Sequence, residues 1–157
     1  MTKRVAPTAS YPLGPALDFL QRLWQLNHAL EKLSSRMEKN LGVTAQQRLV
    51  LRCVGRYPGV TAGQLASMLH VDPGTVSASL SRLESKGMID RRQDPRDKRR
   101  ASLGLTSKGR ALDQPAEGTV ENAVERLLGG ASAAELSSMM KIVDQLTSLL
   151  EEELPAD

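Results

Sequence analysis

The sequence predicts a mainly α-helical fold with one small β-hairpin. Apolar residues recur at every third or fourth position through residues 13–42 and again in shorter stretches downstream, which is the period of amphipathic helices. Thr44, Thr61 and Asp72 stand directly before such stretches and are residue types that begin helices. Residues 88–105 instead alternate loosely around a charged centre, which is typical of two strands joined by a long loop.

The composition is that of a folded protein of one domain. The chain has 157 residues, of which 40% are apolar and 25% charged, and this combination excludes a disordered chain. No segment has the apolar centre of a signal peptide or the ~18 apolar residues of a membrane span, so we expect a cytoplasmic protein. The single cysteine, Cys53, excludes an intrachain disulfide, and the widely separated His28 and His70 predict neither a metal site nor a cofactor.

Charge is unevenly distributed along the chain. Residues 1–81 carry 9 basic and 4 acidic side chains, residues 82–110 carry 10 and 4, and residues 111–157 carry 2 and 10. The segment DPRDKRR, residues 94–100, contains no apolar residue at all. Basic charge concentrated in this way predicts a polyanionic partner, and the alternative is a loop that is merely solvated.

Two short helices joined by a tight turn are predicted between residues 61 and 87. After the connection His70–Val71, Asp72 is suited to cap the second helix and Pro73 to occupy its first position. Apolar residues one and two turns apart define the inward side of that helix, namely Val76, Leu80 and Leu83. This arrangement predicts a helix-turn-helix, whose second helix can lie in the DNA major groove.

Beyond the hairpin, helices are predicted to begin after Thr106 and after Ser132. Pro115 is expected to kink or break the first of them, and Gly129–Gly130 separates it from the second. Ser132 and Glu135 have the spacing of a capping box, and apolar residues follow at helical spacing up to an acidic end.

The order of these elements and three blocks of sequence resemble the MarR family of winged helix-turn-helix transcription regulators. The blocks are VTAQQRLVL from Val43, TAGQLASMLHVDPGTVSASLSRLESKGMIDRR from Thr61, and DPRDKRRASLGLTSKGR from Asp94. The resemblance covers residues 13–150 and implies a winged helix-turn-helix with N- and C-terminal dimerisation helices. The sequence departs from the family in the small side chains of the second helix-turn-helix helix and in the Gly and Pro content after the hairpin.

The resemblance divides the chain into four parts. These are a flexible N-terminal segment (1–12), a dimerisation helix (13–42), a winged helix-turn-helix DNA-binding domain (43–105) and C-terminal dimerisation helices (106–157). A two-fold homodimer on double-stranded DNA would present two recognition helices to a roughly palindromic operator. The predicted dimerisation residues are Leu13, Leu17, Leu20, Leu136, Met140, Val143, Leu146 and Leu150. The alternative is that both apolar stripes pack within one subunit.

Two surfaces are predicted to contact DNA. The outward side of the second helix carries small side chains, which let the backbone approach a groove floor, and the start of this helix favours a phosphate. In the hairpin, the resemblance assigns Arg99 to the minor groove with Asp97 holding it, and the other basic side chains are left to contact phosphates. The predicted helix contacts are Pro73, Gly74, Thr75, Ser77, Ala78, Ser81 and Arg82. The predicted wing contacts are Arg91, Arg96, Asp97, Lys98, Arg99 and Arg100. A solvated surface is the alternative for both sets.

The resemblance also implies a small aromatic or phenolic effector between the dimerisation and DNA-binding parts. The candidates to line its pocket are Trp24, His28, Met37, Arg48 and Arg52. Each has an alternative that its residue type favours: core for Trp24 and Met37, surface or core for His28, and phosphate contact for the two arginines. Cys53 is expected to be a buried, inert thiol and not a redox sensor.

The sequence therefore predicts a homodimeric, sequence-specific DNA-binding regulator, a repressor of nearby genes that a ligand can release. The alternative is a helix-turn-helix protein that acts mainly through a protein partner and binds DNA weakly. An enzyme is not predicted, because the sequence has no Gly-rich phosphate loop, no nucleophile motif and no metal-ligand spacing.

Overall fold

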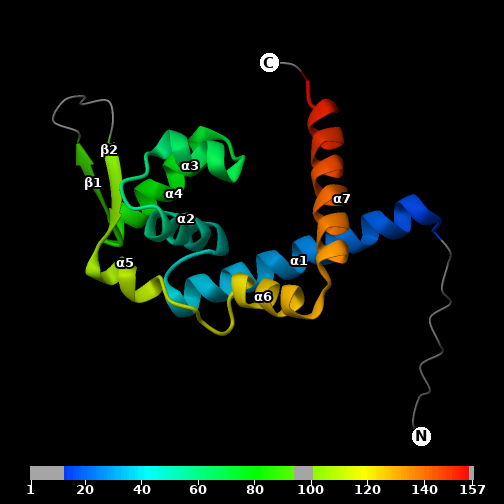
Figure 1. Cartoon of the computed structure of the whole chain (residues 1–157), viewed down its shortest axis with the longest axis horizontal. Helices are drawn as coiled ribbons and strands as arrows, with labels where there is room; N and C mark the ends of the chain where they lie inside the picture. The colour runs from blue at the N-terminus through cyan, green and yellow to red at the C-terminus, as the bar shows by residue number, and fades with distance from the viewer. Residues whose placement is uncertain (1–12, 94–100, 156–157) are drawn as a thin grey trace, which may run out of the picture.

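The computed structural model describes residues 13–93 and 101–155, and within them the chain is mainly helical with one two-stranded hairpin (Figure 1). The elements are α1 (Pro15–Leu41), α2 (Ala45–Arg56), α3 (Ala62–Leu69), α4 (Pro73–Ser85), β1 (Ile89–Gln93), β2 (Ala101–Leu105), α5 (Ser107–Leu112), α6 (Val120–Gly130) and α7 (Ala133–Glu152). The order of helix-turn-helix and hairpin confirms the predicted fold class, a winged helix-turn-helix flanked by terminal helices. Among the helices of the described residues, none is sufficiently long and apolar to cross a membrane.

Side chains at the helix starts satisfy N–H groups that have no partner within the helix. Three helices use a capping box, in which the cap side chain accepts from the third residue's N–H and that residue's side chain accepts from the cap's N–H. The pairs are Thr44 with Gln47, Thr61 with Gln64, and Ser132 with Glu135. The box at Ser132 was predicted from the sequence. For the other two helices only the cap residue was predicted, although their T-x-x-Q spacing carries the same signal.

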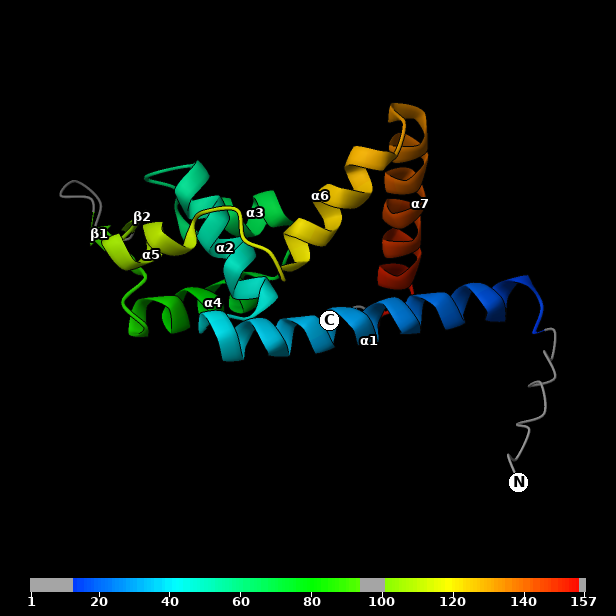
Figure 2. The same cartoon turned by 90° about the horizontal axis from the view of Figure 1, so that it is seen from below.

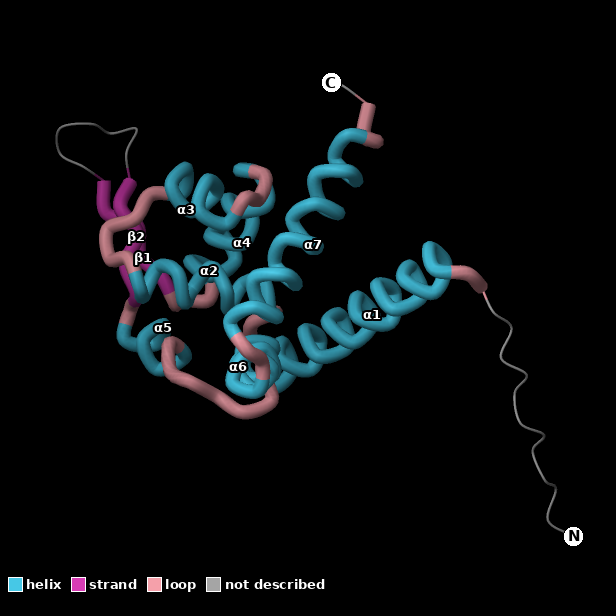
Figure 3. The backbone as a smooth tube through the Cα atoms, turned by 45° about the vertical axis from the view of Figure 1, so that its right-hand side comes forward, coloured by secondary structure: helices cyan, strands magenta, loops and turns pink. Residues whose placement is uncertain are grey.

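The hydrophobic core lies between α2, α3, α4 and the hairpin (Figure 3). Leu51, Leu65 and Leu80 are fully buried in it, and Leu103 joins them from β2. The buried cluster consists of Val43, Val50, Leu51, Val54, Val60, Leu65, Ala66, Val76, Leu80, Leu83, Met88, Ile89 and Leu103. Because both helices of the helix-turn-helix and both strands contribute to one cluster, the outward side of α4 has a fixed position relative to the hairpin.

The turn between α3 and α4 has the predicted length. His70 ends α3 with a left-handed φ of 50°, and the Val71 N–H donates to the Ala66 carbonyl at 3.1 Å. Asp72 then accepts a hydrogen bond from the Thr75 N–H at 3.0 Å, as predicted for a cap. Three residues therefore separate the two helices, and the second packs directly against the first.

The hairpin is anchored to the core at its base. β1 and β2 pair antiparallel from Ile89 opposite Leu105 to Gln93 opposite Ala101. Leu103 also exchanges two backbone hydrogen bonds, each of 2.9 Å, with the Gly59–Val60 segment before α3. No pattern in the sequence predicted this attachment. The predicted tip, residues 94–100, lies outside the described residues.

The region after the hairpin contains three helices in the described residues, whereas two were predicted from the sequence. The helix predicted from Thr106 is divided into α5, which ends at Leu112, and α6, which begins at Val120. Pro115 lies in the connection between them, where the missing N–H cannot continue a helical ladder. The structure thus selects a break over a kink.

The start of α6 depends on Thr119, which was not among the caps predicted from the sequence. Its hydroxyl accepts from the Asn122 N–H at 3.3 Å and donates to the Ala116 carbonyl at 2.7 Å. The residue is buried, so these two bonds leave its hydroxyl satisfied.

The helices α1 and α7 extend away from the core (Figure 1 and Figure 2). Met37, near the C-terminal end of α1, is the one residue of that helix that is buried. The helix α6 lies beside α1, and α7 continues from it with no buried residue. Amphipathic helices that leave so much apolar surface uncovered are typical of subunit interfaces.

Gly109 in α5 permits a close contact with the base of the hairpin. A Cβ atom at this position would overlap the Met88 carbonyl oxygen and lie 3.3 Å from Leu105 Cδ2. We expect Gly109→Ala to lower the free energy of unfolding by about 1–3 kcal/mol, because α5 must move away from β1. Chemical denaturation measures this change.

The matched control is Gly63→Ala in α3, where no atom lies within 4 Å of the added methyl group. That variant should be as stable as the wild type or more stable by about 0.4–1 kcal/mol. If both variants lost the same free energy of unfolding, the contact with Met88 would not be the cause of the loss.

Candidate nucleic-acid interface

The structure turns the small side chains of α4 outward. Val76, Leu80 and Leu83 are buried in the core, as predicted. Of the residues predicted to contact DNA on the opposite side, Thr75 is half-buried and the others are exposed, namely Pro73, Gly74, Ser77, Ala78, Ser81 and Arg82. Apart from the Pro73 ring, no side chain on this surface before Arg82 is larger than Thr. The floor of a DNA groove can therefore come close to the helix backbone.

The start of α4 is less suited to a phosphate than the sequence suggested. The Asp72 carboxylate already accepts the Thr75 N–H at 3.0 Å. This places a negative charge at the helix end that would otherwise attract an anion. A phosphate at this terminus would lie close to the Asp72 carboxylate, which opposes its binding.

The two arginines of β1 lie in different environments. Arg91 Nε is 3.0 Å from Glu84 Oε2 at the end of α4, so its charge is shared with a carboxylate. Arg92 lies 3.5 Å from Asp90, and its side chain is 80% exposed. The predicted phosphate contact Arg91 thus shares its charge with a carboxylate, and Arg92, which was not predicted, is the more exposed of the two cations. The predicted contacts Arg96, Asp97, Lys98, Arg99 and Arg100 lie outside the described residues.

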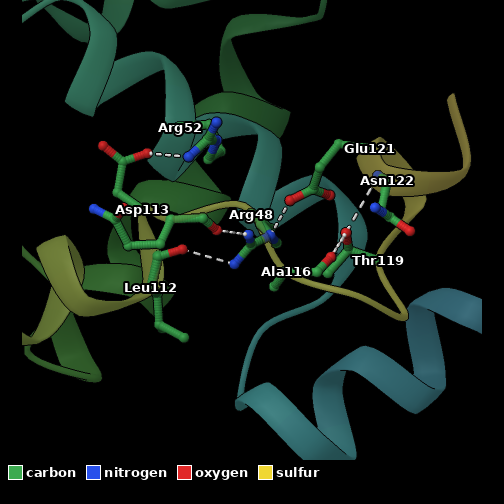
Figure 4. Close-up of polar contacts among 9 residues, drawn as sticks. Arg48, Arg52, Leu112, Asp113, Ala116, Thr119, Glu121 and Asn122 are labelled. Atoms are coloured by element: carbon green, nitrogen blue, oxygen red, sulfur yellow. Dashed lines mark hydrogen bonds and ion pairs between the residues drawn. The ribbon is translucent and has the colours of Figure 1, made fainter. Parts of the chain in front are cut away.

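Arg48 and Arg52 of α2 are occupied by contacts within the chain (Figure 4). Arg48 is only 1% exposed and bonds to the Leu112 and Gln114 carbonyls and to the Glu121 carboxylate. Arg52 pairs with Asp113 at 3.0 Å. The assignment of Arg48 to an effector pocket is wrong, and so is its alternative as a phosphate contact, because its donors are used and shielded from solvent.

The five residues predicted to line an effector pocket do not meet in one cavity of the described residues. Trp24 is 67% exposed, so its alternative as a core residue is also wrong, whereas Met37 is buried as that alternative required. His28 is exposed on α1. Arg52 lines a cavity of about 570 Å³, together with Cys53, Arg56, Tyr57 and Asp113.

Cys53 is half-buried in α2, beside the buried Val54. Burial raises the pKa of its thiol above the ordinary value. Since the thiolate is the reactive form, a raised pKa disfavours oxidation, although the thiol is half-buried and not fully buried as expected. Within residues 13–93 and 101–155, no three His, Cys, Asp or Glu side chains are grouped as metal ligands would be.

Most of the predicted dimerisation residues are left exposed by their own chain. Leu136 and Leu146 are half-buried, and the remaining six are exposed: Leu13, Leu17, Leu20, Met140, Val143 and Leu150. The alternative that both stripes pack within one subunit is therefore wrong. Phe19, Trp24 and Leu26 extend the exposed apolar surface of α1, and Ile142 and Leu149 extend that of α7.

Several known proteins are similar to this chain in sequence or in fold. The MarR family profile matches residues 43–101. The transcriptional regulator TtmR of Methylorubrum extorquens is 32% identical over 70% of this chain, which spans 54% of the length of TtmR. The transcriptional repressor Rv2887 of Mycobacterium tuberculosis is 30% identical over 69% of this chain and 78% of its own length. The crystal structure of Streptococcus pneumoniae FabT in complex with DNA, 28% identical, covers 88% of this chain and 99% of FabT with a TM-score of 0.63. The chain belongs to the MarR family of DNA-binding transcriptional regulators.

Proposed function

We propose that this protein is a cytoplasmic, homodimeric repressor of nearby genes that binds a pseudo-palindromic operator. The observation that carries the proposal is the exposed face of α4, which combines small side chains with hydroxyl groups and one arginine. A solvated helix face usually carries long charged side chains, so this composition favours close contact with a groove. The FabT–DNA complex and the repressor Rv2887 support the assignment by similarity.

In the proposed complex, α4 lies in the major groove. Thr75, Ser77 and Ser81 offer hydroxyl groups to base edges or phosphates, and the Ala78 methyl can contact a thymine methyl. Arg82 has the reach for a guanine or a phosphate. The hairpin, with Arg92 and the basic side chains among residues 94–100, is proposed to contact the adjacent DNA backbone. Arg99, supported by Asp97, is proposed to enter the minor groove.

The proposed dimer forms through the uncovered apolar faces of α1 and α7. A two-fold axis would place the two α4 helices in half-sites about 10 to 10.5 base pairs apart, or a multiple of that separation. With about six phosphates neutralised per dimer, the logarithm of affinity should fall with the logarithm of salt concentration at a slope of about −5.

Arg82→Ala tests the role of α4. Replacement in both subunits should lower operator affinity by about 1–3 kcal/mol if Arg82 contacts a base, and should make the salt slope less negative by about 2 if it contacts a phosphate. Fluorescence anisotropy with the footprinted promoter duplex, at several salt concentrations, measures both quantities.

The matched control is Arg126→Ala, which removes an exposed arginine from α6 outside the winged helix. Its affinity and slope should equal those of the wild type. If Arg82→Ala binds as the control does, α4 is not the DNA-reading helix. A partner protein that is retained in high salt, where operator binding is lost, would favour the alternative of protein-mediated action.

Met140→Glu tests the dimer. A carboxylate in the proposed interface would be buried without a partner, so the variant should elute as a monomer at micromolar concentration and lose operator binding. Lys141→Glu places the same group on the polar side of α7 and should stay dimeric. Light scattering after size exclusion compares them, and a dimeric Met140→Glu would contradict the proposed interface.

The proposed repressor is released by a small aromatic or phenolic anion. The cavity beside Arg52 supports this part of the proposal, because Arg56 supplies a cation and Tyr57 an aromatic ring. From a panel of aromatic carboxylates at millimolar concentration, at least one should release the operator from the wild type and fail to release it from Arg56→Gln. If no compound releases the DNA, or if release does not depend on Arg56, this part of the proposal is wrong.

A further inference from the structure

One buried side chain of the winged helix holds the start of the C-terminal helices. Arg48, in α2, donates from Nη1 to the Leu112 carbonyl and from Nη2 to the Gln114 carbonyl, each at 2.7 Å, and its Nε pairs with the Glu121 carboxylate (Figure 4). These partners are the last residue of α5, the connection that follows it, and the first turn of α6. A single guanidinium thus fixes three successive parts of the chain.

Arg52, one turn further along α2, adds a contact to the same place. Its Nη1 lies 3.0 Å from the Asp113 carboxylate. The two arginines therefore hold residues 112, 113 and 114 against α2. The rest of the connection up to Thr119 is neither helix nor strand, so these side-chain contacts determine its course in place of a backbone ladder.

The direction of α6 matters for a dimer. Because α6 leads directly into α7, a rotation at the connection would move the dimerisation face relative to α4. In a two-fold assembly such a rotation changes the separation of the two recognition helices, and with it the operator that fits. We propose that Arg48 is a positioning residue that sets the half-site spacing of the operator, an inference that rests on the proposed function above.

The chemistry of the position requires arginine. The planar guanidinium presents fixed donors along several directions, here toward two carbonyls and one carboxylate. A lysine at this position supplies a single ammonium centre that cannot reach the same acceptors with the same geometry. An apolar residue of similar length fills the space and leaves the connection without its three anchors.

The test measures spacing preference apart from affinity. The operator is first recovered by selection from a random duplex library, and its two half-sites are then separated or brought together one base pair at a time. The wild type should prefer one spacing. In Arg48→Met, the ratio between affinity at that spacing and affinity at its neighbours should fall about tenfold, a change of the size that residues outside both sites can produce.

A purely structural role would lower affinity equally at every spacing and leave this ratio unchanged. Circular dichroism and binding to an isolated half-site confirm that each variant is folded. Glu121→Ala, which removes the partly exposed acceptor and keeps both carbonyl bonds, should weaken the preference less and decides the question if Arg48→Met does not fold. Arg126→Met, an exposed arginine of α6, is the matched control and should keep the wild-type ratio.

The outcomes separate the two proposals. If the wild type binds paired half-sites no better than one half-site, the proposed dimeric function fails and this inference fails with it. If the wild type has a preferred spacing and the folded Arg48 and Glu121 variants keep the same ratio, the proposed function stands and the inference is overturned.

Discussion

The Arg48 guanidinium connects the winged helix-turn-helix to the C-terminal helices. It does so through two hydrogen bonds and an ion pair. Removing one partner of a buried charge typically costs about 3–5 kcal/mol, because the remaining group loses both water and its counterpart. Arg48 has lost nearly all contact with water, so its stability depends on the Leu112 and Gln114 carbonyls and on Glu121. The connection after α5 depends on Arg48 in turn. If this connection moved away from α2, it would lose the hydrogen bonds and the ion pair with Arg48 that hold it there.

In α4, the burial of apolar side chains offsets a low helix propensity. Its sequence from Pro73 to Ser81 is rich in Gly, Ser and Thr, which have lower helix propensity than Ala or Leu. The helix is retained because Val76, Leu80 and Leu83 are buried on one side and because Asp72 caps its start. Burial of each such side chain contributes about 1.5–3 kcal/mol, more than the propensity lost at each outward position. The core therefore allows the outward face to be chosen for its partner and not for helix formation.

The elements were predictable from the sequence where their cause is local. Caps such as Thr44 and Asp72 and the apolar period of α1 act over a few residues, and each appears where the pattern indicated. The role of Arg48 was not predictable, because two of its partners are backbone carbonyls more than sixty residues away, and a carbonyl leaves no mark on the sequence. For the same reason the backbone attachment of Leu103 to Gly59–Val60 was missed. Trp24 was misjudged because an aromatic residue suits a core and an interface equally, and only the placement of α1 distinguishes them.

The charge of the chain is distributed so that the segment with the hairpin is basic and the C-terminal segment is acidic. Residues 82–110, which include the end of α4 and the hairpin, carry 10 basic and 4 acidic side chains, whereas residues 111–157 carry 2 and 10. Since electrostatic forces reach about 10 Å at moderate ionic strength, a polyanion approaching the molecule is attracted at one end and repelled at the other before any contact forms. In the proposed complex, repulsion at the C-terminal helices would keep DNA away from the apolar faces of α7, and attraction at the hairpin would orient DNA toward α4. The small side chains of α4 would then discriminate bases, and the basic side chains would supply most of the binding energy.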